Sequence, residues 1–182
     1  MQGPLALSRG IDRLNEFIGK SVSWLILLAI LVSAANAVIR KIFDISSNAW
    51  LELQWYLFGA AFMLAAAYTL QRNEHIRIDI ISSHLPKAVR HAIELIGHLF
   101  MLLPFSALMV WETLPNMMES YAIGESSSNY GGLIIWPAKA FIVIGFALLF
   151  LQGISELIKR VAIIAGVIAE TEEAHHTPLP VE

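Results

Sequence analysis

Long uncharged segments alternate with short polar segments along the chain, and four of the uncharged segments are long enough to cross a bilayer. Each approaches the roughly 20 apolar residues that a helix needs to span the hydrocarbon core. The spans are expected at about residues 21–43, 49–71, 87–114 and 133–160. The pattern therefore predicts an all-α integral membrane protein with four transmembrane helices, in a membrane domain covering residues 21–162.

The segment before the first span, residues 1–20, has a different pattern. Leu7, Ile11, Leu14 and Ile18 recur at the spacing of one helix face, and the charged residues fall elsewhere. This pattern predicts an N-terminal amphipathic helix that lies in the membrane interface. It does not fit a signal peptide, because the apolar run that follows is too long for an h-region.

Composition supports the membrane class. The chain is 57% hydrophobic and 15% charged, with a mean hydropathy of +0.63, whereas an average globular protein carries roughly 25% charged residues. The net charge of -3 argues against nucleic acid as a partner. The absence of cysteine excludes disulfides, thiolate metal sites and cysteine nucleophiles.

Basic residues are distributed unevenly between the two sides of the four predicted spans. One side holds Arg9, Arg13, Lys20, Arg72, Arg77, Lys87, Arg90, Lys159 and Arg160, whereas the connections on the other side hold Arg40 and Lys41. The positive-inside rule then places both termini in the cytoplasm and the loop at 124–132 outside. Residues 163–182 form a cytoplasmic tail, and its end is expected to be disordered.

Small and polar residues inside the spans indicate contacts between helices. The second span is slim over the Gly59–Ala61 and Ala65–Ala67 stretches, which favours close approach of neighbouring helices. Asn36 lies at membrane depth in the first span and should face protein. Pro104 predicts a kink in the third span.

Several charged side chains near the span ends have more than one interpretation. Glu52 lies near the start of the second span, where it can complement the unpaired N–H groups of the first turn or contact a partner subunit. Lys139 can extend to the interface, or pair with Glu52 or Glu125. Glu94 and His98 are four residues apart and can hydrogen-bond on one helix face.

No catalytic motif is present, so we expect a protein that is not an enzyme and holds no metal or cofactor. The remaining classes are a subunit of a larger membrane complex and a membrane anchor of a redox complex that binds b-type haem or quinone. Haem in a four-helix bundle needs histidines on facing helices. His98 is the only histidine within a span, and His91 lies on the same predicted helix. The sequence therefore favours the subunit.

Four motifs carry a family resemblance. They are residues 48–58 (NAWLELQWYLF), 73–79 (NEHIRID), 124–129 (GESSSN) and 131–139 (GGLIIWPAK). Over about residues 15–162 the chain resembles the small membrane subunit of tripartite ATP-independent periplasmic (TRAP) transporters, the DctQ-like family.

The resemblance implies a bacterial sodium-coupled importer of an organic solute, usually a carboxylate, in the inner membrane. A periplasmic solute-binding protein delivers the solute to a large elevator-type membrane subunit. The small subunit forms a stable heterodimer with the large one, supports it together with phospholipids, and transports nothing itself.

The resemblance also selects residues for contact with a partner. They are Trp50, Glu52, Gln54, Asn73, His75, Arg77, Asp79, Glu125, Ser126, Trp136 and Lys139. For Arg77 and Asp79 two interpretations stay open. They contact the large subunit or lipid phosphates, or Asp79 caps a helix and Arg77 is a positive-inside residue.

Overall fold

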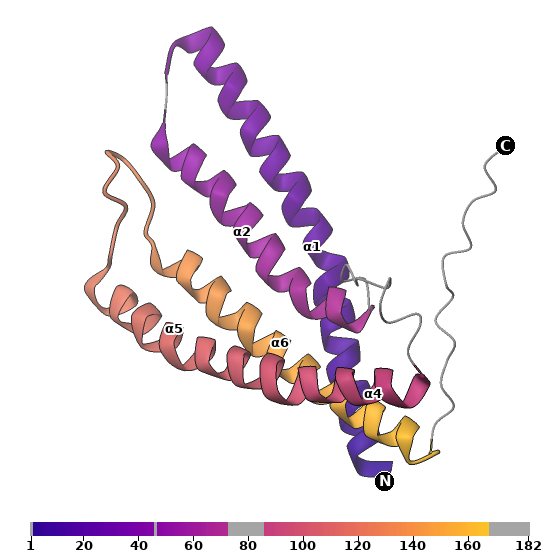
Figure 1. Cartoon of the computed structure of the whole chain (residues 1–182). Coiled ribbons are helices and arrows are strands. Elements are labelled where there is room, and N and C mark those ends of the chain that lie inside the picture. The colour runs from indigo at the N-terminus through magenta and orange to yellow at the C-terminus, as the bar shows by residue number, and fades with distance from the viewer. Residues whose placement is uncertain (1, 46, 73–85, 168–182) are drawn as a thin grey trace, which may run out of the picture.

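Long apolar helices form most of the molecule. The computed structural model describes residues 2–45, 47–72 and 86–167, and within these ranges the chain forms helices and one isolated bridge between Ser126 and Ile134 (Figure 1). The elements are α1 (Gln2–Phe43), α2 (Asn48–Gln71), α4 (Lys87–Ile96), the π-helix η1 (Gly97–Leu102), α5 (Leu103–Ile123) and α6 (Trp136–Ile164). Four helical runs are long and apolar enough to cross a membrane. The predicted all-α membrane fold with four transmembrane helices is confirmed.

The N-terminal amphipathic segment and the first span form one helix. α1 has 42 residues, which at about 1.5 Å per residue is roughly twice the ~30 Å hydrocarbon core. The expected boundary near residue 20 is not a helix end, because no proline follows Pro4 in this segment and Gly10 and Gly19 are tolerated within the helix. Whether its first half lies along the membrane surface stays a prediction.

A seven-residue repeat sets the face of α1 that packs within the chain. Ser8, Asn15, Val22, Ala29 and Asn36 are all buried, and such a repeat keeps one face of a helix against its neighbours. The burial of Asn36 confirms that it faces protein. Of the predicted apolar face of residues 1–20, Ile11 is also buried, whereas Leu7 is 58% exposed and Leu14 is 45% exposed.

α2 packs through its small residues, as predicted. Ala60, Ala61 and Ala67 are buried. The turn before α2 is tight, because Asp44 takes a φ of 53°, a left-handed conformation that aspartate tolerates at the end of a helix.

The third helical run is interrupted by the π-helix η1, directly before Pro104. Proline lacks an N–H and its ring displaces the carbonyl four residues earlier, and the wide π-helical turn makes room for that ring. The run then continues to Ile123, beyond the end expected at 114, because the backbone reverses only at Gly124, which has a φ of 62°. α6 likewise begins at Trp136 rather than 133, and Pro137 occupies its first turn.

α6 is the central helix of the described chain. It contacts α1, α2, α5, α4 and η1, and α1 also packs along α2 (Figure 1). α5 packs against α6 and lies at the edge. Burial of the apolar stretches reflects this order. In the 18-residue apolar stretch of α6, 33% is buried within the chain, whereas in that of the third helical run only 6% is buried.

Candidate functional site

Glu52 anchors the loop between α5 and α6. Ser127 donates its hydroxyl to Glu52 Oε1, Asn129 Nδ2 donates to the same oxygen at 2.9 Å, and the backbone N–H of Leu133 donates to Oε2 at 2.6 Å. Both carboxylate oxygens therefore accept hydrogen bonds from the loop. Asn48 Nδ2 adds a bond of 2.9 Å to the carbonyl of Tyr130. The carboxylate binds this loop rather than simply complementing the start of its own helix.

Glycine is required where the loop passes closest to Glu52. A Cβ atom at Gly132 would lie 2.5 Å from Ser127 Cβ and 2.8 Å from Glu52 Oε1. Gly131 takes a φ of 70° beside it, which favours glycine. The Gly131-Gly132 pair therefore lets the loop close over the carboxylate.

A second carboxylate ties the same loop to α6. Lys139 Nζ lies 2.6 Å from Glu125 Oε2, so the predicted pairing of Lys139 is with Glu125 and not with Glu52. This bond lowers the pKa of the Glu125 carboxyl below its ordinary value. Tyr121 and Trp136 close the base of the loop with an edge-to-face contact of 5.3 Å between ring centroids.

The structure brings part of the predicted contact set together. Glu52, Glu125, Ser126, Trp136 and Lys139 line the start of α2 and the loop that leads into α6. Trp50 is 41% exposed beside them and Gln54 is half-buried. The four remaining members lie outside the described residues, namely Asn73, His75, Arg77 and Asp79. Contact of these residues with a partner stays a prediction.

A buried polar network joins α1 to α6 at the opposite end, and sequence reasoning missed it. Gln152 is fully buried. Its Oε1 accepts from Asn15 Nδ2 at 2.7 Å, while its Nε2 donates to Asp12 Oδ1 at 2.9 Å and to Glu156 Oε1 at 2.8 Å. Both N–H groups of the Gln152 side-chain amide therefore donate within the chain.

Serines and a lysine complete this network. Ser155 Oγ donates to Asp12 Oδ1 at 2.8 Å, and the hydroxyls of Ser155 and Ser8 lie 2.7 Å apart. Lys159 Nζ lies 3.3 Å from Asp12 Oδ2 and 2.5 Å from Glu156 Oε1. A signal for this site was present in the sequence, because Gln152 is a strong hydrogen-bonding group in an apolar span and such groups must face protein.

The next residue of α6 reaches a third element. Arg160 forms an ion pair with Glu94 of α4. His98 Nδ1 contacts the backbone carbonyl of Glu94 at 2.7 Å, so the expected bond between His98 and Glu94 involves the main chain rather than the carboxylate. Lys159 and Arg160 together connect α6 to α1 and α4.

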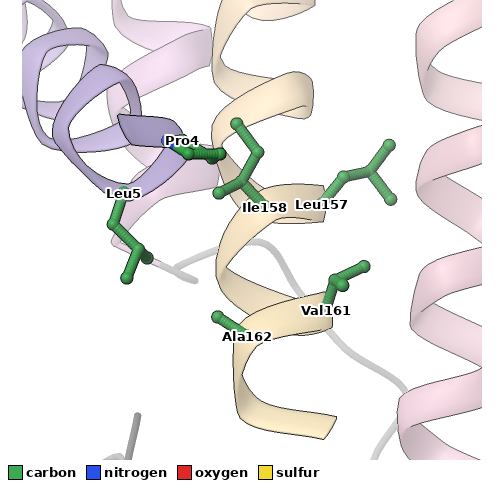
Figure 2. A pocket seen from close by; sticks show the side chains of 6 residues that line it. All are labelled: Pro4, Leu5, Leu157, Ile158, Val161 and Ala162. Atoms are coloured by element: carbon green, nitrogen blue, oxygen red, sulfur yellow. The ribbon is translucent and has the colours of Figure 1, made fainter. Parts of the chain in front are cut away.

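An apolar hollow of about 260 Å³ lies between the first turns of α1 and the last turns of α6 (Figure 2). Its lining is Pro4, Leu5, Leu157, Ile158, Val161 and Ala162. It offers no polar group to orient a charged solute, whereas a hydrocarbon chain matches it. Among the described residues, no group of three or more histidine, aspartate or glutamate side chains is placed to hold a metal ion.

These features define a multi-pass helical membrane protein whose polar side chains fix the helices to one another at both ends. Comparison with protein families identifies its membership. Residues 21–163 match the family described as the DctQ component of tripartite ATP-independent periplasmic transporters, and the chain belongs to this family. It is therefore a small TRAP transporter component, and its family is a transporter family rather than an enzyme family. The comparison with curated proteins gave no match, and neither did the comparison with solved structures.

Proposed function

We propose that the protein is the scaffold subunit of a sodium-coupled TRAP transporter in the bacterial inner membrane. It supports a large elevator-type subunit that imports an organic solute, a carboxylate, delivered by a periplasmic binding protein. In this role it transports nothing by itself. Both termini lie in the cytoplasm.

The main support for the proposal is that the polar side chains bind the loop and the helices of this same chain to one another. Glu52 and Glu125 bind the outer loop, while Gln152 and Lys159 bind the opposite ends of the helices to each other. Side chains that fix helices in this way favour a rigid frame over a moving carrier. The outward surfaces of the helices are largely apolar, as contact with lipid and with other helices requires.

Phospholipids fit this frame as further partners. The hollow lined by Leu5 and Leu157 has the apolar lining that an acyl chain needs (Figure 2). The redox-anchor alternative gains no support, because the family match is to a transporter component.

Reconstitution tests the proposed role. The chain is purified alone and together with the large subunit, each is placed in liposomes, and sodium-driven uptake of solute is measured with the binding protein present. We expect uptake from the complex and none from the chain alone. Sodium-driven uptake by the small subunit alone would overturn the proposal, as would failure of the wild-type chain to purify with the large subunit.

A further inference from the structure

α5 carries a charged side chain on its outward face at membrane depth. Glu112 lies within the apolar run Ala92–Ile123, and the described part of the chain leaves its side chain exposed. Leu108 precedes it by one turn on the same face and is 56% exposed, and Asn116 follows by one turn and is exposed too. We call Leu108, Glu112 and Asn116 the outward stripe of α5.

Contacts with α6 set the depth of Glu112. On its cytoplasmic side, Ala107 and Val110 share an apolar hollow with Ala147 and Phe150. On its outer side, Tyr121 contacts Trp136 near the start of α6. Because the two helices run in opposite directions, Glu112 lies beside the uncharged stretch 140–145 of α6, below the level of the aromatic pair.

The direction of the side chain places the carboxylate deeper still. In an α-helix the Cα–Cβ bond tilts toward the N-terminus of the helix. The N-terminus of α5 is the end that lies beside Gly153 of α6, away from the outer loop (Figure 1). The Glu112 side chain therefore points toward the middle of the membrane rather than toward the outer surface.

Glu112 has no compensating partner in the part of the chain that the structure describes, since it forms no hydrogen bond or ion pair there. Lipid tails offer no donor to a carboxylate, so ionisable residues at this depth face protein or a water-filled cavity. Among the described elements, α5 lies at the edge and packs along α6, apart from its continuation into η1, so its outward face is open to another subunit (Figure 1).

We infer that the outward stripe of α5 is a surface by which this chain binds the large TRAP subunit, and that Glu112 accepts a hydrogen bond from a cationic or N–H donor side chain of that subunit. The inference rests on the proposed function, which supplies the partner. Charge complementarity selects the partner's chemistry, because a carboxylate in an apolar contact needs a donor opposite to it.

The variant Glu112→Leu distinguishes contact of Glu112 with the large subunit from exposure of Glu112 to lipid. In lipid, Glu112→Leu removes a costly charge, so the complex should form at least as well as with the wild-type chain. Against a donor of the large subunit, the same change leaves that donor unpaired. We then expect the yield of co-purified large subunit to fall at least about tenfold, with a smaller fall for Glu112→Gln, which keeps an acceptor. Circular dichroism checks that each variant keeps its helices.

Photo-crosslinking gives an independent readout. The chain has no cysteine, so Leu108→Cys and Asn116→Cys each provide one site for a benzophenone maleimide while Glu112 stays in place. We expect both to capture the large subunit on illumination. Trp24→Cys, on exposed α1 at the other edge of the chain, measures capture from a different face.

The outcomes distinguish the inference from the proposed function. Loss of the complex with Glu112→Leu, together with capture of the large subunit from positions 108 and 116, supports the inference. Wild-type yield with Glu112→Leu, or no capture from either position in a complex that purifies intact, overturns it and leaves the scaffold role standing. A wild-type chain that does not purify with the large subunit overturns the proposed function instead.

Discussion

Glu52 shows how one carboxylate organises the end of the molecule at which α2 begins. It accepts hydrogen bonds from three groups of a loop that lies more than seventy residues further along the chain. Such a bond network leaves little free space, and Gly132 is the residue at its centre. A side chain there would have to displace both Ser127 and Glu52.

Gly132→Ala should therefore destabilise the protein. The added methyl group would lie 2.5 Å from Ser127 Cβ, and overpacking of this kind costs about 1–3 kcal/mol. Thermal unfolding in detergent, followed by tryptophan fluorescence, should show a lower midpoint. Gly59→Ala is the matched control, because nothing lies within 4 Å of its added Cβ and alanine is the better helix former. Equal midpoints for the two variants would contradict the close packing at Gly132.

Glu125 makes the stability of the loop between α5 and α6 dependent on pH. Lys139 holds the folded-state pKa of Glu125 below the ordinary value of 4.5. The ionised pair thus contributes stability that is present above pH 4.5 and is lost as the pH falls through the lowered pKa. We expect the difference in unfolding midpoint between the wild-type chain and Glu125→Gln to be constant from pH 7 to about 5 and to shrink in more acidic buffer. A difference that grows on acidification would contradict the ion pair.

At the scale of the elements, the contact between α1 and α6 depends on polar side chains within an apolar setting. Gln152 is the residue on which most of its bonds converge. Removing such a group leaves Asn15 Nδ2 without its acceptor and takes one donor from Asp12 Oδ1, which keeps the hydroxyl of Ser155. Each unsatisfied buried group costs about 1–3 kcal/mol, so the first turns of α1 should detach more readily.

Limited proteolysis should detect this loosening after Gln152→Ala. Arg9 and Arg13 are exposed trypsin sites on the part of α1 that the network holds, and cleavage needs local unfolding. We expect cleavage there to become roughly tenfold faster for a loss of about 1.4 kcal/mol. Thr113→Ala is the control, because that hydroxyl bonds only the carbonyl of Met109 in its own helix. Unchanged cleavage after Gln152→Ala would mean that the network does not hold α1.

The sequence was sufficient to locate the helices but not every boundary. Uncharged length identified all four spans, and the small residues of α2 identified its packing faces. The third run was expected to end near 114 because Glu112 interrupts the apolar pattern, whereas backbone geometry at Gly124 ends it. The pairing of Asn15 with Gln152 could not be predicted, because it depends on how two helices far apart in sequence are rotated against each other.

At the scale of the whole molecule, basic side chains are more numerous at one end of the helices than at the other, where Arg40 and Lys41 end α1. Lys20 and Arg72 share Glu16 near the start of α1 and the end of α2, and Lys159 lies at the end of α6. Lys139 is at the far end of α6. A charge distribution of this kind sets orientation during insertion, so the end with the start of α1 should face the cytoplasm.

Labelling of single cysteines in intact cells tests this orientation. Tyr130 is 97% exposed in the loop between α5 and α6, so with the predicted orientation Tyr130→Cys should react with a membrane-impermeant maleimide added outside. Arg9→Cys, at the opposite end, should react only after the membrane is permeabilised. The chain supplies no competing thiol. Because the side rich in lysine and arginine stays in the cytoplasm, labelling at 9 but not at 130 would reverse the topology. It would also place the Glu52 loop, the proposed outer face of the scaffold, on the side away from the periplasmic binding protein.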